Sequence, residues 1–270
     1  MGALNHLLRS LAPVTQSGWD LLDREAKEHL TATLAARKLV DFSGPEGWEH
    51  SATNLGRTEA IAEAPAEGVQ ARARRVLPLV ELRTPFSVSR EELRDNDRGA
   101  EDADLDDLDE AAKQLALAEN VAVFHGWEQA GIGGITEASP HSQIRRGKSI
   151  EHYPRPVAKG VELLLRSGVS GPYGLALSPD EYTTVIETAE HGGYPLFDHL
   201  RKILGGPIVW APGVRGAVVL SLRGGDFLFE SGQDIAVGYE SHDGEVVNLY
   251  LEESFSFRVV TPEAAVALGA

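Results

Sequence analysis

The sequence contains no cysteine, only one methionine and no long run of apolar residues. The absence of cysteine excludes disulfides, thiolate metal sites and a cysteine nucleophile, and it fits a reducing compartment. Because no stretch of about 18 apolar residues occurs, we expect no transmembrane helix. The first residues, MGALNHLLRS, lack the basic and long apolar regions of a secretory signal, so we predict a cytoplasmic protein.

Positive charge is also scarce. The 25 Lys and Arg residues are outnumbered by 41 Asp and Glu residues, which gives a formal net charge of −16. Phosphate backbones and anionic lipids would be repelled by this field, and the sequence shows no basic patch that would reverse it. We therefore predict no nucleic-acid partner and no membrane partner.

Recognisable catalytic and metal-binding motifs are missing. The segment Gly168–Pro172 resembles a nucleophile elbow until its last position, where Pro172 replaces the required glycine. The nine histidines show no zinc-protease spacing, although a metal site assembled by folding stays open. From the sequence we assign no catalytic residue, no metal ligand and no cofactor.

Two amphipathic helices are predicted from hydrophobic periodicity. Thr15 or Ser17 can cap a helix that runs to about residue 38. Residues 91–110 hold 11 acids and two bases, and acids are favoured at the positive end of a helix dipole. Apolar residues at three-to-four spacing follow them, which predicts a long helix over 103–126.

The segment 48–80 has few apolar anchors and is typical of an extended hairpin. Polar and apolar residues alternate from Val69 to Arg74, before a richer strand over 77–82. A hairpin of this kind buries neither face within its own chain, so we expect a neighbouring element to cover it.

The rest of the chain mixes short strands and helices. Residues 135–223 indicate an α/β unit with helical windows and short strands. After Gly224 and Gly225, the segments 227–230, 235–240, 246–252 and 255–260 are typical of a β-meander. The expected fold class is therefore α+β.

Nine short sequence segments, which follow one another along the whole chain, resemble segments of the encapsulin shell proteins of bacteria and archaea (family 1, linocin-like). The segments are Leu11–Pro13, Arg37–Asp41, Gly44–Glu49, Leu77–Arg83, Phe124–Trp127, Gly171–Tyr173, Arg223–Phe227, Gly232–Tyr239 and Glu253–Val259.

The resemblance implies the fold of tailed-phage major capsid proteins, the Hong Kong 97-type fold. Its parts would be an N-terminal helix and the start of a peripheral domain over 1–47, an extended E-loop over 48–80, and the peripheral domain with its spine helix over 81–135. An axial domain would follow over 136–223, and closing strands of the peripheral domain over 224–270. Many identical copies would tile a closed icosahedral shell, of which the smallest needs roughly 60.

In this family a groove between the first helix and the last strands receives a short C-terminal targeting peptide of a cargo enzyme. Carried over by motif, the groove would use Leu30, Leu34, Arg37, Asp41, Asp234, Ile235 and Val237. Apolar members would bury the peptide, and Arg37 would pair with its carboxylate groups. The alternative is that the apolar residues only fill the core while Arg37 pairs with Asp41.

The segment Glu187, Thr188, Ala189, Glu190, His191, Gly192 and Gly193 matches the loop that encapsulins place around a five-fold pore. Symmetry would copy Glu190 and His191 into rings that favour small cations. The alternative is an exposed glycine turn without a gating role.

The cargo most often enclosed by this family is a ferritin-like iron oxidase, which serves iron storage, or a dye-decolourising peroxidase. Two other functions compete: a prophage capsid that packages nucleic acid, and a bacteriocin- or protease-like enzyme. The acidic N-terminal region argues against the first, because packaged nucleic acid favours a basic inner face. The missing catalytic motifs argue against the second.

Overall fold

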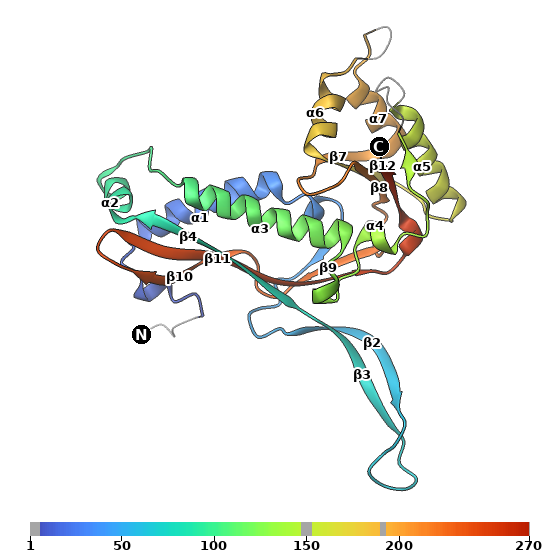
Figure 1. The fold of residues 1–270 in the computed structure, drawn as a ribbon, viewed down its shortest axis with the longest axis horizontal. Helices are drawn as coiled ribbons and strands as arrows, with labels where there is room; N and C mark the ends of the chain where they lie inside the picture. The colour runs from blue at the N-terminus through green and yellow to red at the C-terminus, as the bar shows by residue number, and fades with distance from the viewer. Residues whose placement is uncertain (1–5, 147–152, 190–192, 270) are drawn as a thin grey trace.

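The computed structural model describes residues 6–146, 153–189 and 193–269. These residues form two sheets with helices packed on them and a hairpin that projects away from both (Figure 1). The helices are α1 (Gln16–Thr33), α2 (Arg90–Arg98), α3 (Asp106–His125), α4 (Ile135–Ala138), α5 (Pro154–Arg166), α6 (Pro179–Glu187) and α7 (Leu196–Leu204). The strands are β1 (Asp41–Ser43), β2 (Ala52–Ile61), β3 (Ala71–Pro78), β4 (Val80–Ser89), β5 (Ile144–Arg145), β6 (Tyr173–Leu177), β7 (Gly205–Trp210), β8 (Ala217–Ser221), β9 (Phe227–Ser231), β10 (Ala236–His242), β11 (Val246–Val259) and β12 (Ala265–Gly269).

The first sheet is organised around the long strand β11. Strand β4 pairs with β11 from Val246 to Phe255, while β10 and then β9 pair with it on successive parts of its length. The sequence predicted two strands over 246–260. The structure forms one, because Glu253 and Ser254 remain in register with β4.

Helices α1 and α3 lie along one face of this sheet (Figure 1) and share one apolar core with it. The Thr15 hydroxyl accepts a hydrogen bond from Gly18 N, which caps α1 as the sequence predicted. Three acids in the first turn of α3 lie at the positive end of its dipole. Helix α1 ends at Thr33, earlier than predicted, and a short 3₁₀ turn, Ala36–Lys38, continues the chain.

The second sheet has the order β5-β12-β8-β6-β7 and carries α5, α6 and α7. Every residue of β6 and β8 is buried, as expected for strands covered by helices. Strand β12 pairs with β8 and β5, so the last residues belong to this second sheet. The predicted division differs here, because it assigned all of 224–270 to the peripheral domain, whereas β12 pairs with strands of the segment predicted as axial.

Strands β2 and β3 form the antiparallel hairpin expected over 48–80, and it extends far from both sheets (Figure 1). Most of its residues are exposed. Its base is held firmly, because Thr53 and His50 each contact Glu230 Oε1 at 2.7 Å. The projecting part has no partner among the described residues of its own chain, since β2 and β3 pair only with each other.

Candidate functional site

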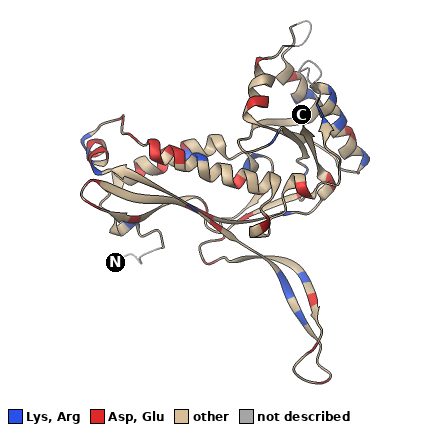
Figure 2. Cartoon of the chain, viewed as in Figure 1, with Lys and Arg blue, Asp and Glu red and all other residues tan. Residues whose placement is uncertain are grey.

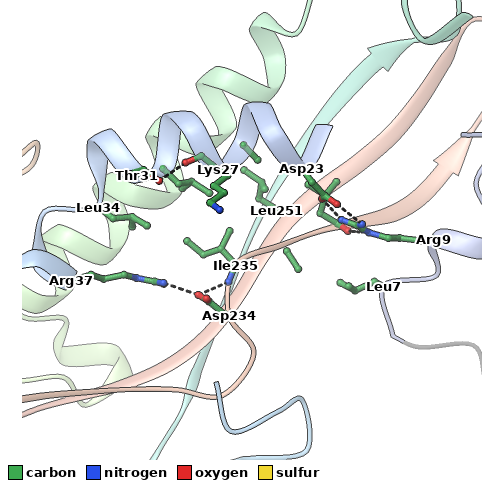
Figure 3. Close-up of a pocket in the computed structure, with 14 residues that line it drawn as sticks. Leu7, Arg9, Asp23, Lys27, Thr31, Leu34, Arg37, Asp234, Ile235 and Leu251 are labelled. Atoms are coloured by element: carbon green, nitrogen blue, oxygen red, sulfur yellow. Dashed lines mark hydrogen bonds and ion pairs between the residues drawn. The ribbon is translucent and has the colours of Figure 1, made fainter. Parts of the chain in front are cut away.

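A groove of about 580 Å³ opens between α1 and the strands of the first sheet (Figure 3). This volume lies in the range of typical ligand sites. Its lining combines an apolar floor with charged residues at both ends: Leu7, Arg9, Asp23, Ala26, Lys27, Leu30, Thr31, Leu34, Arg37, Asp234, Ile235, Ala236, Val237 and Leu251.

Three segments from distant parts of the sequence build the groove. Helix α1 contributes one wall, because Ala26 and Leu30 are one helical turn apart on the same face. The segment before β10 contributes the opposite wall. The N-terminal segment closes one end, where Leu7 O accepts a hydrogen bond from Tyr239 N at 2.9 Å and Arg9 Nε donates to Val237 O at 2.7 Å.

Of the seven residues predicted for this groove, the structure brings six together. Leu30, Leu34, Arg37, Asp234, Ile235 and Val237 all line it. Asp41 does not line it. It lies in β1 beside β9, and its carboxylate accepts a hydrogen bond from Gly225 N at 2.6 Å.

Arg37 is bound by three carboxylates, none of which belongs to Asp41. Its Nε donates to Glu119 at 2.7 Å, one terminal nitrogen donates to Asp234 at 2.6 Å, and the other donates to Glu253 at 2.7 Å. The guanidinium also lies 5.0 Å from the centre of the Phe42 ring. Three of the five N–H groups of Arg37 are therefore taken by carboxylates of its own chain, and its predicted pairing with Asp41 is not formed.

Two of these three carboxylates lie in the protein interior. The side chains of Glu119 and Glu253 are 0% and 1% exposed, whereas that of Asp234 is 45% exposed. Burial raises the pKa of both glutamates above the ordinary range, and their mutual proximity raises the pKa of Glu253 further. Burial opposes the charge on Arg37, but attraction to Glu119 and Glu253 outweighs it and raises the Arg37 pKa.

Each of the two buried glutamates has a second carboxylate oxygen, Oε1, beside the Oε2 atom that Arg37 contacts. Glu119 Oε1 and Glu253 Oε1 are both buried and accept no conventional hydrogen bond. The two side chains are within hydrogen-bonding reach of each other. A single proton shared by this pair would give each of the two oxygens a hydrogen-bond partner, and the raised pKa of both carboxyl groups favours it.

Asn120 fixes the turn that carries Arg37 into this cluster. Its Oδ1 accepts hydrogen bonds from Ala35 N and Ala36 N, both at 3.0 Å, and its amide donates to Thr33 O at 2.9 Å. These groups follow directly on the end of α1, where the backbone needs outside partners. Sequence analysis did not identify Glu119, Asn120 or Glu253.

Two charges in the groove remain available to a ligand. Lys27 points into the groove (Figure 3), and its ammonium forms no ion pair within the described residues. Asp234 Oδ1 is occupied by Arg37 and by Ile235 N, but its Oδ2 forms no hydrogen bond in the described parts of the chain. With its apolar floor, the groove can bind an extended peptide that carries both apolar and charged side chains.

The predicted pore segment joins α6 to α7 in the second domain. Glu187 ends α6, Thr188 O accepts a hydrogen bond from Leu196 N at 3.0 Å, and Ala189 forms a β-bridge with Pro195. Gly193 has a φ of +80°, a conformation that glycine adopts readily. Glu190, His191 and Gly192 lie outside the described residues, and the pore assignment stays a prediction.

No helix among the described residues combines the length and the hydropathy needed to cross a membrane.

Comparison with known proteins identifies the family. The sequence profile of a family described as "encapsulating protein for peroxidase" (Linocin_M18) matches residues 4–256. The type 1 encapsulin shell protein of Rhodospirillum rubrum is 47% identical over 270 residues, which cover 98% of this chain and 96% of that protein. The type 1 encapsulin shell protein of Mycobacterium tuberculosis is 42% identical over 265 residues, covering 98% and 99% of the two chains.

Solved structures show the fold. A virus-like particle from Pyrococcus furiosus matches with a TM-score of 0.63 at 19% identity, covering 92% of this chain and 98% of that one. The capsid of an empty GTA particle matches with a TM-score of 0.54 at 14% identity, covering 88% and 90%. These matches confirm the expected α+β fold of the Hong Kong 97 type. Since their identities are low, they show the fold alone and do not favour a viral function. The family profile and the curated relatives together place this chain among the type 1 encapsulin shell proteins, as a structural shell subunit and not an enzyme.

Proposed function

We propose that about 60 copies of this chain assemble in the cytoplasm into a closed icosahedral shell that encloses a cargo enzyme. The near full-length similarity to type 1 encapsulin shell proteins supports assembly. The family description, which names peroxidase, supports a dye-decolourising peroxidase as cargo, with a ferritin-like protein as the second cargo class.

The projecting hairpin is the part of the subunit that needs a second copy. Ile61 and Val76 are 50% and 49% exposed there, and an isolated two-stranded hairpin is marginally stable in water. Arginines are grouped on β3 (Figure 2), at 72, 74 and 75. Acidic residues are concentrated at the start of α3. A neighbouring subunit covers the apolar positions and supplies carboxylates to the arginines.

The groove binds the C-terminal targeting peptide of the cargo. The observation that carries this proposal is the apolar floor of Leu30, Leu34 and Ile235 between two charged ends, on a subunit whose family encloses other proteins. Peptide side chains buried on this floor contribute about 25 cal/mol for each Å² of apolar surface removed from water.

Free charges in the groove determine which peptide fits. Because only its Oδ1 is engaged, by Arg37 and by Ile235 N, Asp234 offers Oδ2 as the acceptor for a basic peptide side chain. Lys27 is the donor for a carboxylate, including the one at the peptide's own end. The preferred ligand is therefore a short peptide with apolar residues and at least one basic residue.

Small substrates and ions enter through pores. We assign the segment from Glu187 to Gly193 to the five-fold pore, where each copy contributes its acidic side chains to a ring. The support is the match of this segment to the family's pore loop, in which Glu187 is the last residue of α6.

The test is cargo loading by Ile235→Asp. Co-expression with a fluorescent protein that carries the C-terminal peptide of a neighbouring cargo gene should yield loaded wild-type shells. The variant should form intact shells that carry less than a tenth of the fluorescence, because it places a charge on the apolar floor. Ile186→Asp is the matched control, since Ile186 is exposed on α6 in the second domain. Normal loading of Ile235→Asp would refute the groove assignment.

A further inference from the structure

A cluster of three potential metal ligands lies where α1 packs against α3. Glu25 and His29 are four residues apart on one face of α1, and Asp109 comes from the first turn of α3. His29 Nε2 lies 3.3 Å from Glu25 Oε1 and 3.1 Å from Asp109 Oδ1. One ligand atom from each residue lies within 4.8 Å of the other two.

The spacing of these atoms is that of ligands around one ion. Two atoms each bound at about 2.1 Å to a transition metal are about 3.0 Å apart in octahedral and about 3.4 Å apart in tetrahedral geometry. The two separations from His29 Nε2, 3.1 and 3.3 Å, fall in this interval, and the two carboxylate oxygens lie within 4.8 Å of each other. Little rearrangement is therefore needed for an ion to bind.

The local bonding leaves this position open to a cation. Asp109 Oδ1 is buried and has no hydrogen-bond partner, although His29 Nε2 is close to it. Among the ion pairs formed by the described residues, none joins a lysine or arginine to Glu25 or Asp109. Two carboxylates thus converge on one imidazole without a permanent positive charge to balance them.

The ligand types and their exposure define the ion. An imidazole nitrogen with two carboxylate oxygens suits first-row divalent transition metals such as Zn²⁺, whereas Mg²⁺ and Ca²⁺ prefer oxygen alone. The three side chains are 28%, 30% and 21% exposed for His29, Glu25 and Asp109, so water can complete the coordination.

We propose that Glu25, His29 and Asp109 form a binding site for a first-row divalent transition-metal cation that clamps α1 to α3. The same turns of α1 present Ala26 and Leu30 to the groove, so the ion holds one groove wall against the spine of the subunit. The site lies within one chain and is independent of cargo, and its test does not depend on peptide binding.

The experiment measures Zn²⁺ on purified protein in its assembled form, after removal of metal with EDTA and dialysis against micromolar Zn²⁺. Elemental analysis should give one more Zn²⁺ per chain for the wild type than for His29→Ala. Asp109→Asn, which keeps the side-chain shape, should lose the same equivalent or bind it at least tenfold more weakly. His141→Ala is the control, because His141 lies in the second domain, where it contacts Glu263 O, and it should bind as the wild type does.

Thermal unfolding in the presence of Zn²⁺ is a second test, and it applies even if one variant folds poorly. Zn²⁺ should raise the thermal unfolding midpoint of the wild type and of His141→Ala, but not that of Asp109→Asn. Equal Zn²⁺ content in the wild type, His29→Ala and Asp109→Asn would overturn the proposal. So would the absence of a stabilising effect on the wild type, in which case His29 only contacts the two carboxylates within the folded chain.

Discussion

Glu119 of α3 and Glu253 of β11 share one guanidinium, that of Arg37, at 2.7 Å from each carboxylate. The cluster joins the spine helix, the central strand of the first sheet and the turn after α1. It lies at one end of the groove through Asp234. One end of the groove is therefore formed by a largely buried ionic cluster, and substitutions in this cluster act on stability first.

Replacement of Arg37 by alanine should destabilise the subunit by about 3–5 kcal/mol, because it leaves two buried carboxylates without their cation. The measurement is the apparent free energy of unfolding in guanidinium chloride. Arg166→Ala is the matched control. It removes an exposed pair with Glu162, so the expected loss is below about 1 kcal/mol. Equal effects of the two substitutions would contradict the role given to Arg37.

Stability should fall as pH rises above the ordinary glutamate value of 4.5. The folded-state pKa values of Glu119 and Glu253 are raised, chiefly by burial, so the folded protein binds a proton that the unfolded chain releases. This stabilisation is complete below the unfolded pKa and is lost as pH rises through the folded pKa.

Glu253→Gln separates this effect from other titrations. Glutamine donates a hydrogen bond to Glu119 without a titratable proton, so the variant's unfolding midpoint should change less between pH 5 and pH 9 than that of the wild type. Parallel pH profiles of the two proteins would show that no shared proton is present.

Asn120→Ala should cost about 2–3 kcal/mol, because Ala35 N, Ala36 N and Thr33 O lose their buried partner together. Chemical denaturation measures the loss. Gln114→Ala on the same helix removes only an exposed contact with Glu110 and should stay within about 0.5 kcal/mol of the wild type. A loss below 1 kcal/mol for Asn120→Ala would mean that water or a shift of the turn replaces its bonds.

Asp234 should determine the preference for a basic peptide residue. We expect Asp234→Asn to weaken binding of a basic targeting peptide about two- to fivefold, and to leave a peptide with alanine at the basic position unaffected. The coupling is modest because the Asp234 side chain is 45% exposed. Fluorescence anisotropy on assembled shells with both peptides completes the double-mutant cycle. Equal losses for both peptides would place the basic side chain elsewhere.

Local patterns predicted the two long helices and the hairpin, because each has a short-range signal: apolar spacing in 15–38 and 103–126, and alternation in 69–74. Strand β12 was misassigned because its partners, Leu268 with Ile144 for example, are far apart in sequence and leave no local pattern. Long-range pairing decides which sheet a terminal strand joins.

Six groove residues followed from the family resemblance, and the rest needed the structure. Asp41 does not line the groove, because the chain turns after Arg37 and enters β1. Glu119 and Asn120 are detectable in the sequence as two polar residues within the apolar spacing of α3. The structure shows that both side chains are fully buried. Leu7 and Arg9 had no such signal, since Leu7 is held by the backbone hydrogen bond from Tyr239 N to Leu7 O, and Arg9 by the bond from its side chain to Val237 O.

The most direct test of the central claim, that the subunit becomes complete only among its copies, is the mass of the purified particles. Mass photometry and electron microscopy of the wild type should show closed particles of about 60 chains. Replacement of residues 57–74, the projecting part of β2 and β3, by a short turn should leave chains that fold but stay small. A wild type that is monomeric across protein concentration and moderate salt, or a truncated chain that still closes into full-size shells, would contradict the claim.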